Sequence, residues 1–341
     1  MDKLVTIGIP VYKRFKYLPS VLNIVASQDY PNIDLLVSDN GINGTAVRDI
    51  VKKYYRKPYR FRQNSTTVGI SAHFNQLIQS ASGEYFVVLA DDDEISSNYV
   101  SDLVGLLEKH SQASVALSIQ ESIDEAGNVI SRSKDTVPEI MSGPDFIRSI
   151  WGTREYGFRS LSTFLARTQQ LKANGGWPNF RVAQGDEDAL IVKLCLDNFV
   201  AFSTRSTFRK RYDDSTDQGS LAIRDLAKGM RDYLQFFETD PKILDYAASH
   251  PDVWAESKRH LVNNAWNTYY FRWAGMYRKR MPPVPWFMAA FAFPFHPSYY
   301  RAVASTLIQA AISATLAQVK RFFPKAYDSY RTMKAKLRKA A

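Results

Sequence analysis

Strand-like and helix-like segments alternate from residue 4 to residue 119 of this 341-residue chain. Short runs rich in β-branched and aromatic residues stop at turn-forming residues, and amphipathic segments lie between them. The predicted strands are 4–9, 33–37, 59–62, 85–90 and 114–119, and the predicted helices are 18–27, 46–55, 71–80 and 98–110. Repeated β-α-β units predict an α/β fold with a single, mostly parallel sheet flanked by helices.

Four consecutive acidic residues, Asp91–Glu94, follow the most apolar of these strands. Ligands of doubly wound sheets bind beyond the carboxyl ends of the strands. Adjacent carboxylates repel one another unless a cation lies among them, and Mg²⁺ or Mn²⁺ prefers carboxylate and phosphate oxygens. The cluster therefore predicts a metal site that also holds a diphosphate. The alternative is a solvated cap of the helix that begins near Asn98.

The single cysteine, Cys195, excludes an internal disulfide and lies in an apolar run. The first residues lack the basic-then-apolar layout of a signal peptide. Both features lead us to expect a cytoplasmic protein.

The formal net charge of +10 lies entirely in the last part of the chain. Residues 1–215 carry 25 basic and 25 acidic side chains, whereas residues 216–341 carry 19 and 9. This shift predicts a domain boundary near residue 215, followed by a helical C-terminal region over 216–341.

The C-terminal region interleaves aromatic, apolar and basic side chains. The apolar run 284–294 is too short to span a bilayer, and the run 302–319 contains six Ser, Thr or Gln residues. Eight basic residues follow between Lys320 and Lys339. Such segments bind anionic membrane surfaces, which predicts a peripheral position on the inner face of the cell membrane. The alternative is a bundle that packs on the first domain or forms a homo-oligomer. The pattern lacks a groove-reading motif, so it does not favour nucleic acid.

Six short motifs stand in a fixed order in residues 3–215. They are Ile-Pro-Val-Tyr-Lys-Arg at 9–14, Val-Ser-Asp-Asn-Gly-Ile-Asn-Gly-Thr at 37–45, Thr-Val-Gly at 67–69 before Asn75, Gly-Glu-Tyr at 83–85, Ala-Asp-Asp-Asp at 90–93, and Gly-Gly-Trp at 175–177. This series resembles the motifs of the family 2 glycosyltransferases, whose donor domain is a Rossmann-like, A-type fold. The chain departs from the family pattern at Thr67 and Ala90, and at Tyr212, where the family often has His.

The resemblance implies a nucleotide-diphosphate sugar as donor and Mn²⁺ or Mg²⁺ as cofactor. The residues that it assigns to the donor site are Pro10, Tyr12, Arg14, Asp39, Asn40, Asp91, Asp92, Asp93 and Arg211, with Asp92 and Asp93 as metal ligands. The alternative for Asp39 is that it only forms the Asp-Asn-Gly turn. The alternative for Arg211 and its basic neighbours is a solvated turn.

A second acidic group, Asp186-Glu187-Asp188, precedes an apolar helix. Inverting members of the family carry at this place a base that removes the proton of the acceptor hydroxyl. The Gly-Asp pairing favours Asp186, the spacing from Lys193 favours Glu187, and a turn one residue longer favours Asp188. Helix capping is the alternative for each of them.

These features predict an inverting, metal-dependent glycosyltransferase of the hexosyltransferase type. It would move a sugar to a hydroxyl of a glycolipid or surface-polysaccharide acceptor, in its glycan or lipid-linked form. The alternative is a non-catalytic, membrane-associated nucleotide-sugar-binding or assembly subunit, which the departures at Thr67, Ala90 and Tyr212 allow.

Overall fold

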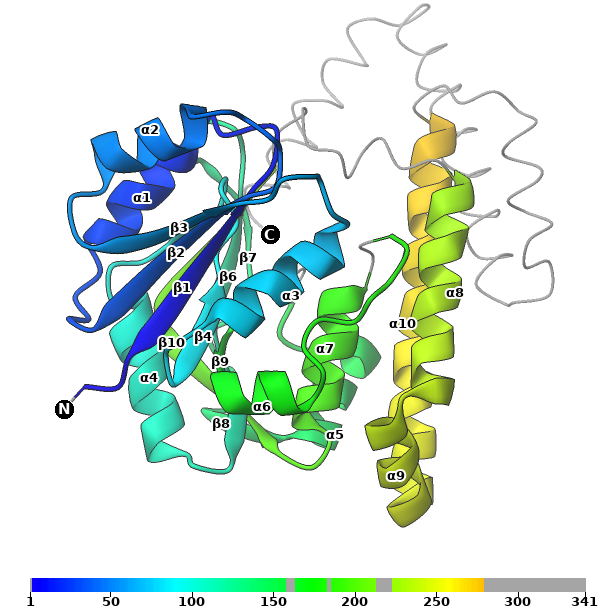
Figure 1. Cartoon of the computed structure of the whole chain (residues 1–341). Helices are drawn as coiled ribbons and strands as arrows, with labels where there is room; N and C mark the ends of the chain where they lie inside the picture. Colours follow the sequence, from blue (N-terminus) through cyan, green and yellow to red (C-terminus); the bar gives the residue numbers. More distant parts are fainter. Residues whose placement is uncertain (1, 158–162, 183–184, 213–222, 279–341) are drawn as a thin grey trace, which may run out of the picture. The chain divides into compact units, whose positions relative to one another are not determined.

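A ten-stranded mixed sheet organises the described part of the chain (Figure 1). The computed structural model describes residues 2–157, 163–182, 185–212 and 223–278, without the side chains of 223–227 and 267–278. The chain divides into two compact units, Met1–Asn264 and Ala265–Ala341. The whole sheet belongs to the first unit.

The first half of the sheet is parallel. It is formed in chain order by β1 (Val5–Val11), α1 (Leu18–Ala26), β2 (Ile33–Asp39), α2 (Ala46–Tyr54), β3 (Tyr59–Gln63), α3 (Ile70–Ser80) and β4 (Tyr85–Val88). β1 pairs with both β2 and β4, and its register with β2 runs from Val5 opposite Ile33 to Val11 opposite Asp39. The carboxyl ends of β1 and β2 are therefore level, and the segments that follow them share one edge of the sheet.

The second half of the sheet contains most of the antiparallel pairs. Its elements are β5 (Glu94–Ile95), α4 (Tyr99–Lys109), β6 (Ala113–Ile123), β7 (Val129–Arg132), β8 (Ile140–Ser142), α5 (Gly143–Ile147), the π-helix η1 (Arg148–Thr153), β9 (Leu165–Arg167), α6 (Thr168–Ala173), α7 (Asp186–Cys195) and β10 (Phe199–Arg211). The strand order is β3-β2-β1-β4-β9-β6-β10-β5, with β7 beside β6 and β8 beside β10. β9 is antiparallel to both of its neighbours, and β10 is parallel to β6.

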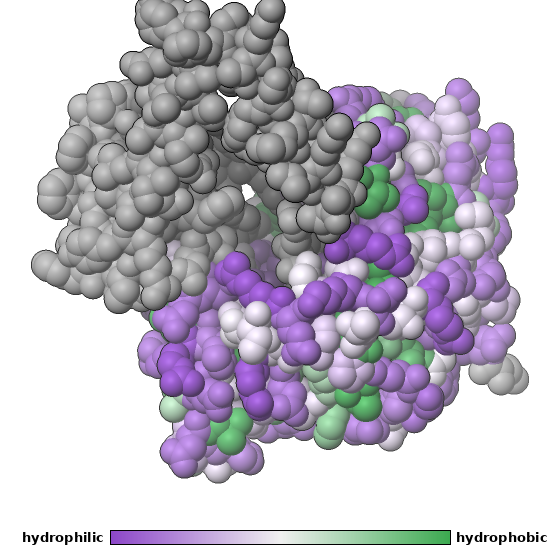
Figure 2. Space-filling model, turned by 180° about the vertical axis from the view of Figure 1, so that it is seen from behind, coloured by the Kyte–Doolittle hydropathy of each residue, from purple (hydrophilic) through white to green (hydrophobic). Residues whose placement is uncertain are grey.

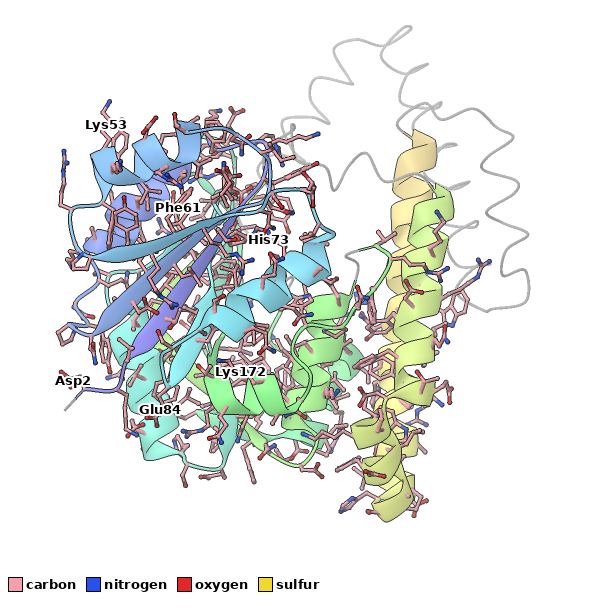
Figure 3. The ribbon with its side chains drawn as sticks, viewed as in Figure 1. Asp2, Lys53, Phe61, His73, Glu84 and Lys172 are labelled. Atoms are coloured by element: carbon pink, nitrogen blue, oxygen red, sulfur yellow. The ribbon has the colours of Figure 1, made fainter. Side chains whose placement is uncertain are left out.

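Side chains along β1 and β4 point alternately to the two faces of the sheet, and helices cover both faces. Val5, Ile7, Ile9 and Val11 of β1 share one core with apolar residues of α1, α2 and α4. On the opposite face, Phe86 and Val88 of β4 meet Ile78 of α3 and Leu171 of α6. Figure 3 shows the side chains between these layers, including Lys172 of α6, which donates to the carbonyl of Ala81 at 2.8 Å. The predicted α/β class is confirmed.

β10 is the main element that the sequence analysis missed. Residues 120–215 look irregular because polar residues interrupt the alternation, and the pairing of β10 with β6 shifts register between Phe202 and Thr207. Ser203, at this irregularity, accepts from the backbone N–H groups of Arg205 at 3.0 Å and Ser206 at 3.3 Å. Side-chain hydrogen bonds thus replace ladder bonds there.

Three helices follow β10 in the described chain: α8 (Ile223–Thr239), α9 (Pro241–Ser249) and α10 (Pro251–Arg278). They lie within the C-terminal region over 216–341 for which helices are predicted. The boundary predicted near residue 215 falls outside the described residues, as do the apolar runs 284–294 and 302–319 and the basic run after them. None of the described helices combines the length and the hydrophobicity that crossing a membrane requires. The face seen in Figure 2 is mainly hydrophilic where its residues are coloured.

The close packing of β4 against β1 can be tested by substitution of Gly83, in the turn before β4. A Cβ at this position would lie 2.6 Å from the backbone N of Thr6 and 2.7 Å from the carbonyl O of Leu4. We expect Gly83→Ala to lower the free energy of unfolding by about 1–3 kcal/mol, measured by urea denaturation, because backbone atoms must move. Gly105→Ala in α4 is the control: its Cβ meets nothing within 4 Å, so it should stabilise by about 0.5–1 kcal/mol. A Gly83→Ala protein as stable as wild type would contradict this packing.

Candidate functional site

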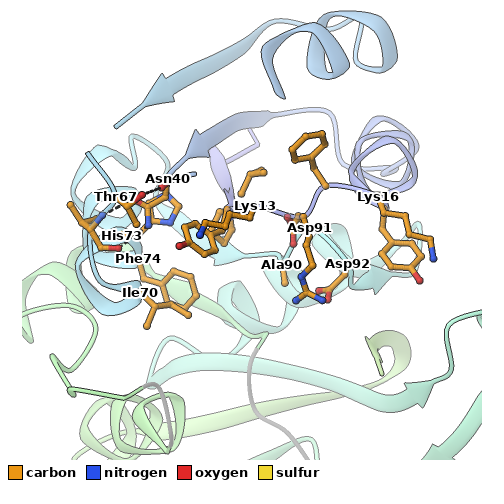
Figure 4. A pocket seen from close by; sticks show the side chains of 17 residues that line it. Lys13, Lys16, Asn40, Thr67, Ile70, His73, Phe74, Ala90, Asp91 and Asp92 are labelled. Atoms are coloured by element: carbon orange, nitrogen blue, oxygen red, sulfur yellow. Dashed lines mark hydrogen bonds between the residues drawn. The ribbon is translucent and has the colours of Figure 1, made fainter. Parts of the chain in front are cut away.

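A pocket of about 810 Å³ opens beyond the carboxyl ends of β1, β2 and β4 (Figure 4). Its walls come from the end of β1 and the following loop, from the residue after β2, from the loop before α3 and the start of α3, and from the acidic turn after β4. The lining residues are Pro10, Val11, Tyr12, Lys13, Arg14, Phe15, Lys16, Tyr17, Asn40, Thr67, Val68, Ile70, His73, Phe74, Ala90, Asp91 and Asp92.

Figure 4 shows two groups of side chains in this pocket, with Lys13 between them. Asn40, Thr67, Ile70, His73 and Phe74 form one group, which we call the neutral end. Asp91 and Asp92 mark the other, acidic end. A flat, weakly polar ligand group suits the first end, and a phosphate–cation group suits the second.

Hydrogen bonds fix the shape of the neutral end. The Asn40 side-chain amide donates to the carbonyl of Val68 at 2.9 Å, and its oxygen accepts from the Val68 N–H at 3.0 Å. Thr67 donates through its hydroxyl to the carbonyl of Asn40 at 3.0 Å. His73 lies 2.8 Å from the Ser38 hydroxyl through Nε2, and burial, with a contribution from Arg62, lowers the pKa of His73 to about 4. The imidazole is therefore neutral at physiological pH.

Asp39 lies beneath the pocket wall rather than in it. Its side chain is fully buried and accepts from the Gly41 N–H at 2.8 Å, from Asn43 at 2.8 Å and from Gln63 at 2.9 Å. These contacts hold the turn after β2, in which Ile42 has a φ of 56°. They match the turn-forming role that the sequence analysis kept open, and contact of Asp39 with a donor stays a prediction.

The acidic turn after β4 buries like charges together. Burial and the charge of Asp92 raise the pKa of Asp91 well above its usual value, and Arg14 opposes the shift. Burial also raises the pKa of Asp92, against Arg14 and Lys210. Burial and the charge of Asp92 raise the pKa of Asp93 to about 7. A bound cation would relieve this repulsion.

Asp91 and Asp92 line the pocket, whereas Asp93 is 4% exposed and accepts from the backbone N–H of Arg211 at 2.9 Å. Within the described ranges, no group of three or more His, Cys, Asp or Glu side chains is arranged to hold a metal ion. One or two carboxylates do suffice for a Mg²⁺-type ion that takes its other ligands from substrate phosphates and water. The residues present fit such a shared ion, and the assignment of Asp92 and Asp93 as its ligands stays a prediction.

Arg211, at the end of β10, ties the acidic turn to its surroundings. Its guanidinium donates to the carbonyls of Asp92 and Glu125, both at 3.0 Å, and forms an ion pair with Glu94. It also stacks over the ring of Tyr17, 4.6 Å from the ring centre. The guanidinium thus braces the wall of the pocket, and its contact with a donor phosphate stays a prediction.

The second acidic group begins α7, as predicted, and two indole N–H groups hold it. Trp177 Nε1 donates to Asp186 at 2.7 Å, and Trp151 Nε1 of η1 donates to Asp188 at 3.3 Å. Burial and the charge of Glu187 raise the pKa of Asp186, and likewise that of Asp188, to about 7. Helix α7 ends at the buried Cys195.

Lys210 of β10 links the two acidic groups. Burial lowers the pKa of Lys210, but the charges of Glu187, Asp93 and Asp92 outweigh it and raise this pKa overall. The lysine therefore interacts with the acidic turn after β4 and with the start of α7. The fold brings together two carboxylate groups that lie 94 residues apart in sequence when Asp92 is compared with Asp186.

The predicted site residues include neither residues of α3 nor the two tryptophans, although Asn75 and Trp177 stand in two of the motifs. Ile70, His73 and Phe74 look like ordinary amphipathic helix residues, and Trp151 lies in no recognised motif. The Gly-Gly-Trp motif was the sequence signal that could have pointed to Trp177. Gly175 and Gly176 have φ of 81° and 72°, which favour glycine at both positions of this turn.

Residues 6–173 match the model of glycosyl transferase family 2. An uncharacterized glycosyltransferase of Rickettsia conorii is 31% identical over 128 residues, which are 37% of this chain and 21% of the relative. Abequosyltransferase RfbV of Salmonella typhimurium is 30% identical over 118 residues, 33% of this chain and 35% of the relative. The chain thus spans about a fifth to a third of the length of these curated relatives.

The poly(ribitol-phosphate) beta-N-acetylglucosaminyltransferase TarS of Staphylococcus aureus is 28% identical over 137 residues, 39% of this chain and 23% of TarS. The crystal structure of TarS 1–349 in complex with UDP-GlcNAc aligns with a TM-score of 0.56 at 18% identity, covering 79% of this chain and 81% of that one. This likeness shows that the two chains share a fold.

Proposed function

We propose that this chain, whose residues 6–173 match the model of glycosyl transferase family 2, transfers a sugar from a nucleotide-diphosphate donor to an acceptor hydroxyl with inversion. The observation that carries this proposal is the pairing of a pocket that has a neutral and an acidic end with a second carboxylate group at the start of α7. The neutral end suits the nucleoside, and the acidic end suits a diphosphate with its cation.

Asp188 is the base in this proposal. In a single displacement, the acceptor oxygen attacks the anomeric carbon, the bond from this carbon to the diphosphate oxygen breaks, and the hydroxyl proton passes to the carboxylate. Asp188 is half-buried and oriented by Trp151, and its pKa of about 7 suits a base near neutral pH. Asp186 is 1% exposed and held by Trp177, while Glu187 interacts with Lys210.

Asp92, with Asp91 or Asp93, would hold the Mn²⁺ or Mg²⁺. When bound, this ion neutralises charge on the diphosphate as it leaves. The protein's own contribution is to place the carboxylates: β4 ends at the pocket, and Arg211 donates to the carbonyl of Asp92 and to the carboxylate of Asp93. Arg14 and Lys210 limit the repulsion within the turn.

The donor proposal predicts loss of transfer in Asp92→Ala. We expect nucleotide-diphosphate release, screened over a panel of nucleotide sugars with Mn²⁺, to fall about 100-fold or more in this variant and in wild type with a chelator, because charge stabilisation by the ion is lost. Asp49→Ala on the exposed face of α2 is the matched control. If wild type binds a nucleotide in calorimetry but releases no product from any donor and acceptor, the non-catalytic subunit is supported instead.

The base assignment predicts that Asp188→Asn lowers kcat about 100-fold or more. Asp186→Asn and Glu187→Gln should lower kcat by smaller factors. In wild type, kcat should fall tenfold per pH unit below about pH 7, because protons neutralise the base, and level off above it. Asp188→Asn should remove this dependence. A larger loss in Glu187→Gln would move the base to that residue. Measurements of kcat from pH 5 to 9 decide between them.

We further propose that the C-terminal region attaches the protein to anionic membranes, near a lipid-linked or polymeric glycan acceptor. The basic and aromatic composition after residue 257 supports this position, since Asp328 is the sole acidic residue there against fifteen basic ones. The name of the TarS relative describes transfer to poly(ribitol-phosphate), which supports a polymeric acceptor.

This position is tested by flotation of the full chain on liposomes with and without anionic lipid. Replacing Lys334, Lys336, Arg338 and Lys339 by Gln should reduce binding to anionic liposomes at least tenfold, at about 1 kcal/mol for each charge near the surface. The control replaces Lys52, Lys53, Arg56 and Lys57, in and after α2, by Gln, which lowers the net charge by the same amount. Equal flotation of all three proteins would contradict attachment through the C-terminal region.

A further inference from the structure

The wall of the pocket continues directly into a contact with the second acidic group. Helix α3 lines the pocket with Ile70, His73 and Phe74, and the next residue is Asn75. The Asn75 side chain binds both backbone groups of Trp177: its oxygen accepts from the N–H at 2.7 Å, and its amide donates to the carbonyl at 2.9 Å. This side chain therefore fixes where residue 177 lies relative to α3.

Trp177 carries the contact onward to α7. Its ring packs edge-on against Phe74 with 4.7 Å between ring centres, and its indole N–H donates to Asp186 at 2.7 Å. Trp177 is 4% exposed and Asp186 is 1% exposed. The other carboxylate oxygen of Asp186 has no hydrogen-bond partner among the described residues. The indole N–H thus supplies a side-chain hydrogen bond to this buried carboxylate.

The turn before Trp177 is shaped for this contact. Gly176 has a φ of 72°, and a Cβ at this residue would lie 2.2 Å from the side-chain oxygen of Asn75. A larger residue would push the asparagine away from the backbone of Trp177. The glycine permits the close approach that places the indole between α3 and α7.

We propose that Trp177 is a positioning residue that, with Asn75, couples the donor pocket to the acidic start of α7. A shift of α3 as the pocket fills moves Phe74 and Asn75, and the indole transmits the shift to Asp186 and so to its neighbours Glu187 and Asp188. The inference rests on the proposed function, because it takes α7 to be the acceptor side of a sugar-transfer site.

The first experiment compares kcat with the donor KM in Trp177→Phe, which keeps an aromatic ring and removes the N–H donor. We expect kcat to fall about tenfold or more, because the carboxylates of α7 are misplaced, with the donor KM within about twofold of wild type. Trp254→Phe, a buried tryptophan that packs on Phe237, should leave both constants unchanged. A kcat within twofold of wild type, or an effect on KM alone, would overturn the inference.

The second experiment needs no turnover, so it separates failure of this inference from failure of the proposed function. Hydrogen exchange of the full chain, measured by mass spectrometry, should be roughly five- to tenfold faster at the start of α7 in Asn75→Ala, as the loss of ordinary hydrogen bonds allows. Exchange in β1 and β2 should not change. Asn32→Ala, which loses a surface hydrogen bond to the carbonyl of Asp2, is the control.

If Asn75→Ala does not fold, Asn75→Asp replaces it, because this change keeps the acceptor for the Trp177 N–H and puts a carboxylate oxygen, which repels the Trp177 carbonyl, in place of the donor. It should still raise exchange at the start of α7 by about twofold or more. Unchanged exchange of α7 in a folded Asn75 variant would show that α3 and α7 are not linked through Trp177, whatever the enzymatic activity of the wild type.

Discussion

Mutual repulsion among the carboxylates of the half-buried Asp91 and Asp92 and the buried Asp93 is the constraint on which the arrangement of the site depends. Burial alone would make three adjacent charged groups costly, and each of them has a raised pKa. The cationic side chains that limit this cost come from distant parts of the chain, with Arg14 after β1 and Lys210 and Arg211 at the end of β10. The sheet brings the end of β10 to the acidic turn through the antiparallel pairing of β10 with β5, in which Arg209 lies opposite Glu94.

The parallel half of the fold was predictable because each strand and helix carries its own local signal. The apolar runs, the turn residues after them and the helical periodicity need no knowledge of distant residues, and helices α1, α2 and α4 lie within two residues of their predicted bounds. β9 and β10 were not predictable in this way. Each depends on pairing with strands distant in the sequence, and β10 breaks its own alternation where Ser203 bonds the backbone.

The candidate site also has a part that was predictable from local sequence and a part that was not. Carboxylates in consecutive positions at a strand end or a helix start are visible in the sequence, and the two groups were found. What these groups contact was not visible, because Trp151, Trp177, Asn75 and Lys210 act through tertiary contacts with partners 9 to 118 residues away. At Asp39, the structure shows contacts that hold the turn after β2, and contact of this side chain with a donor stays a prediction.

Cys195 gives the chain an internal reporter. It is the single cysteine of the sequence, it ends the same helix that begins with the second acidic group, and burial raises the pKa of its thiol. A thiol reagent can therefore reach sulfur only when this helix detaches from its packing, and the reaction needs the thiolate. The rate of labelling would then report how often the helix opens rather than how exposed the sulfur is, and this native residue would report the opening of α7 without an added probe.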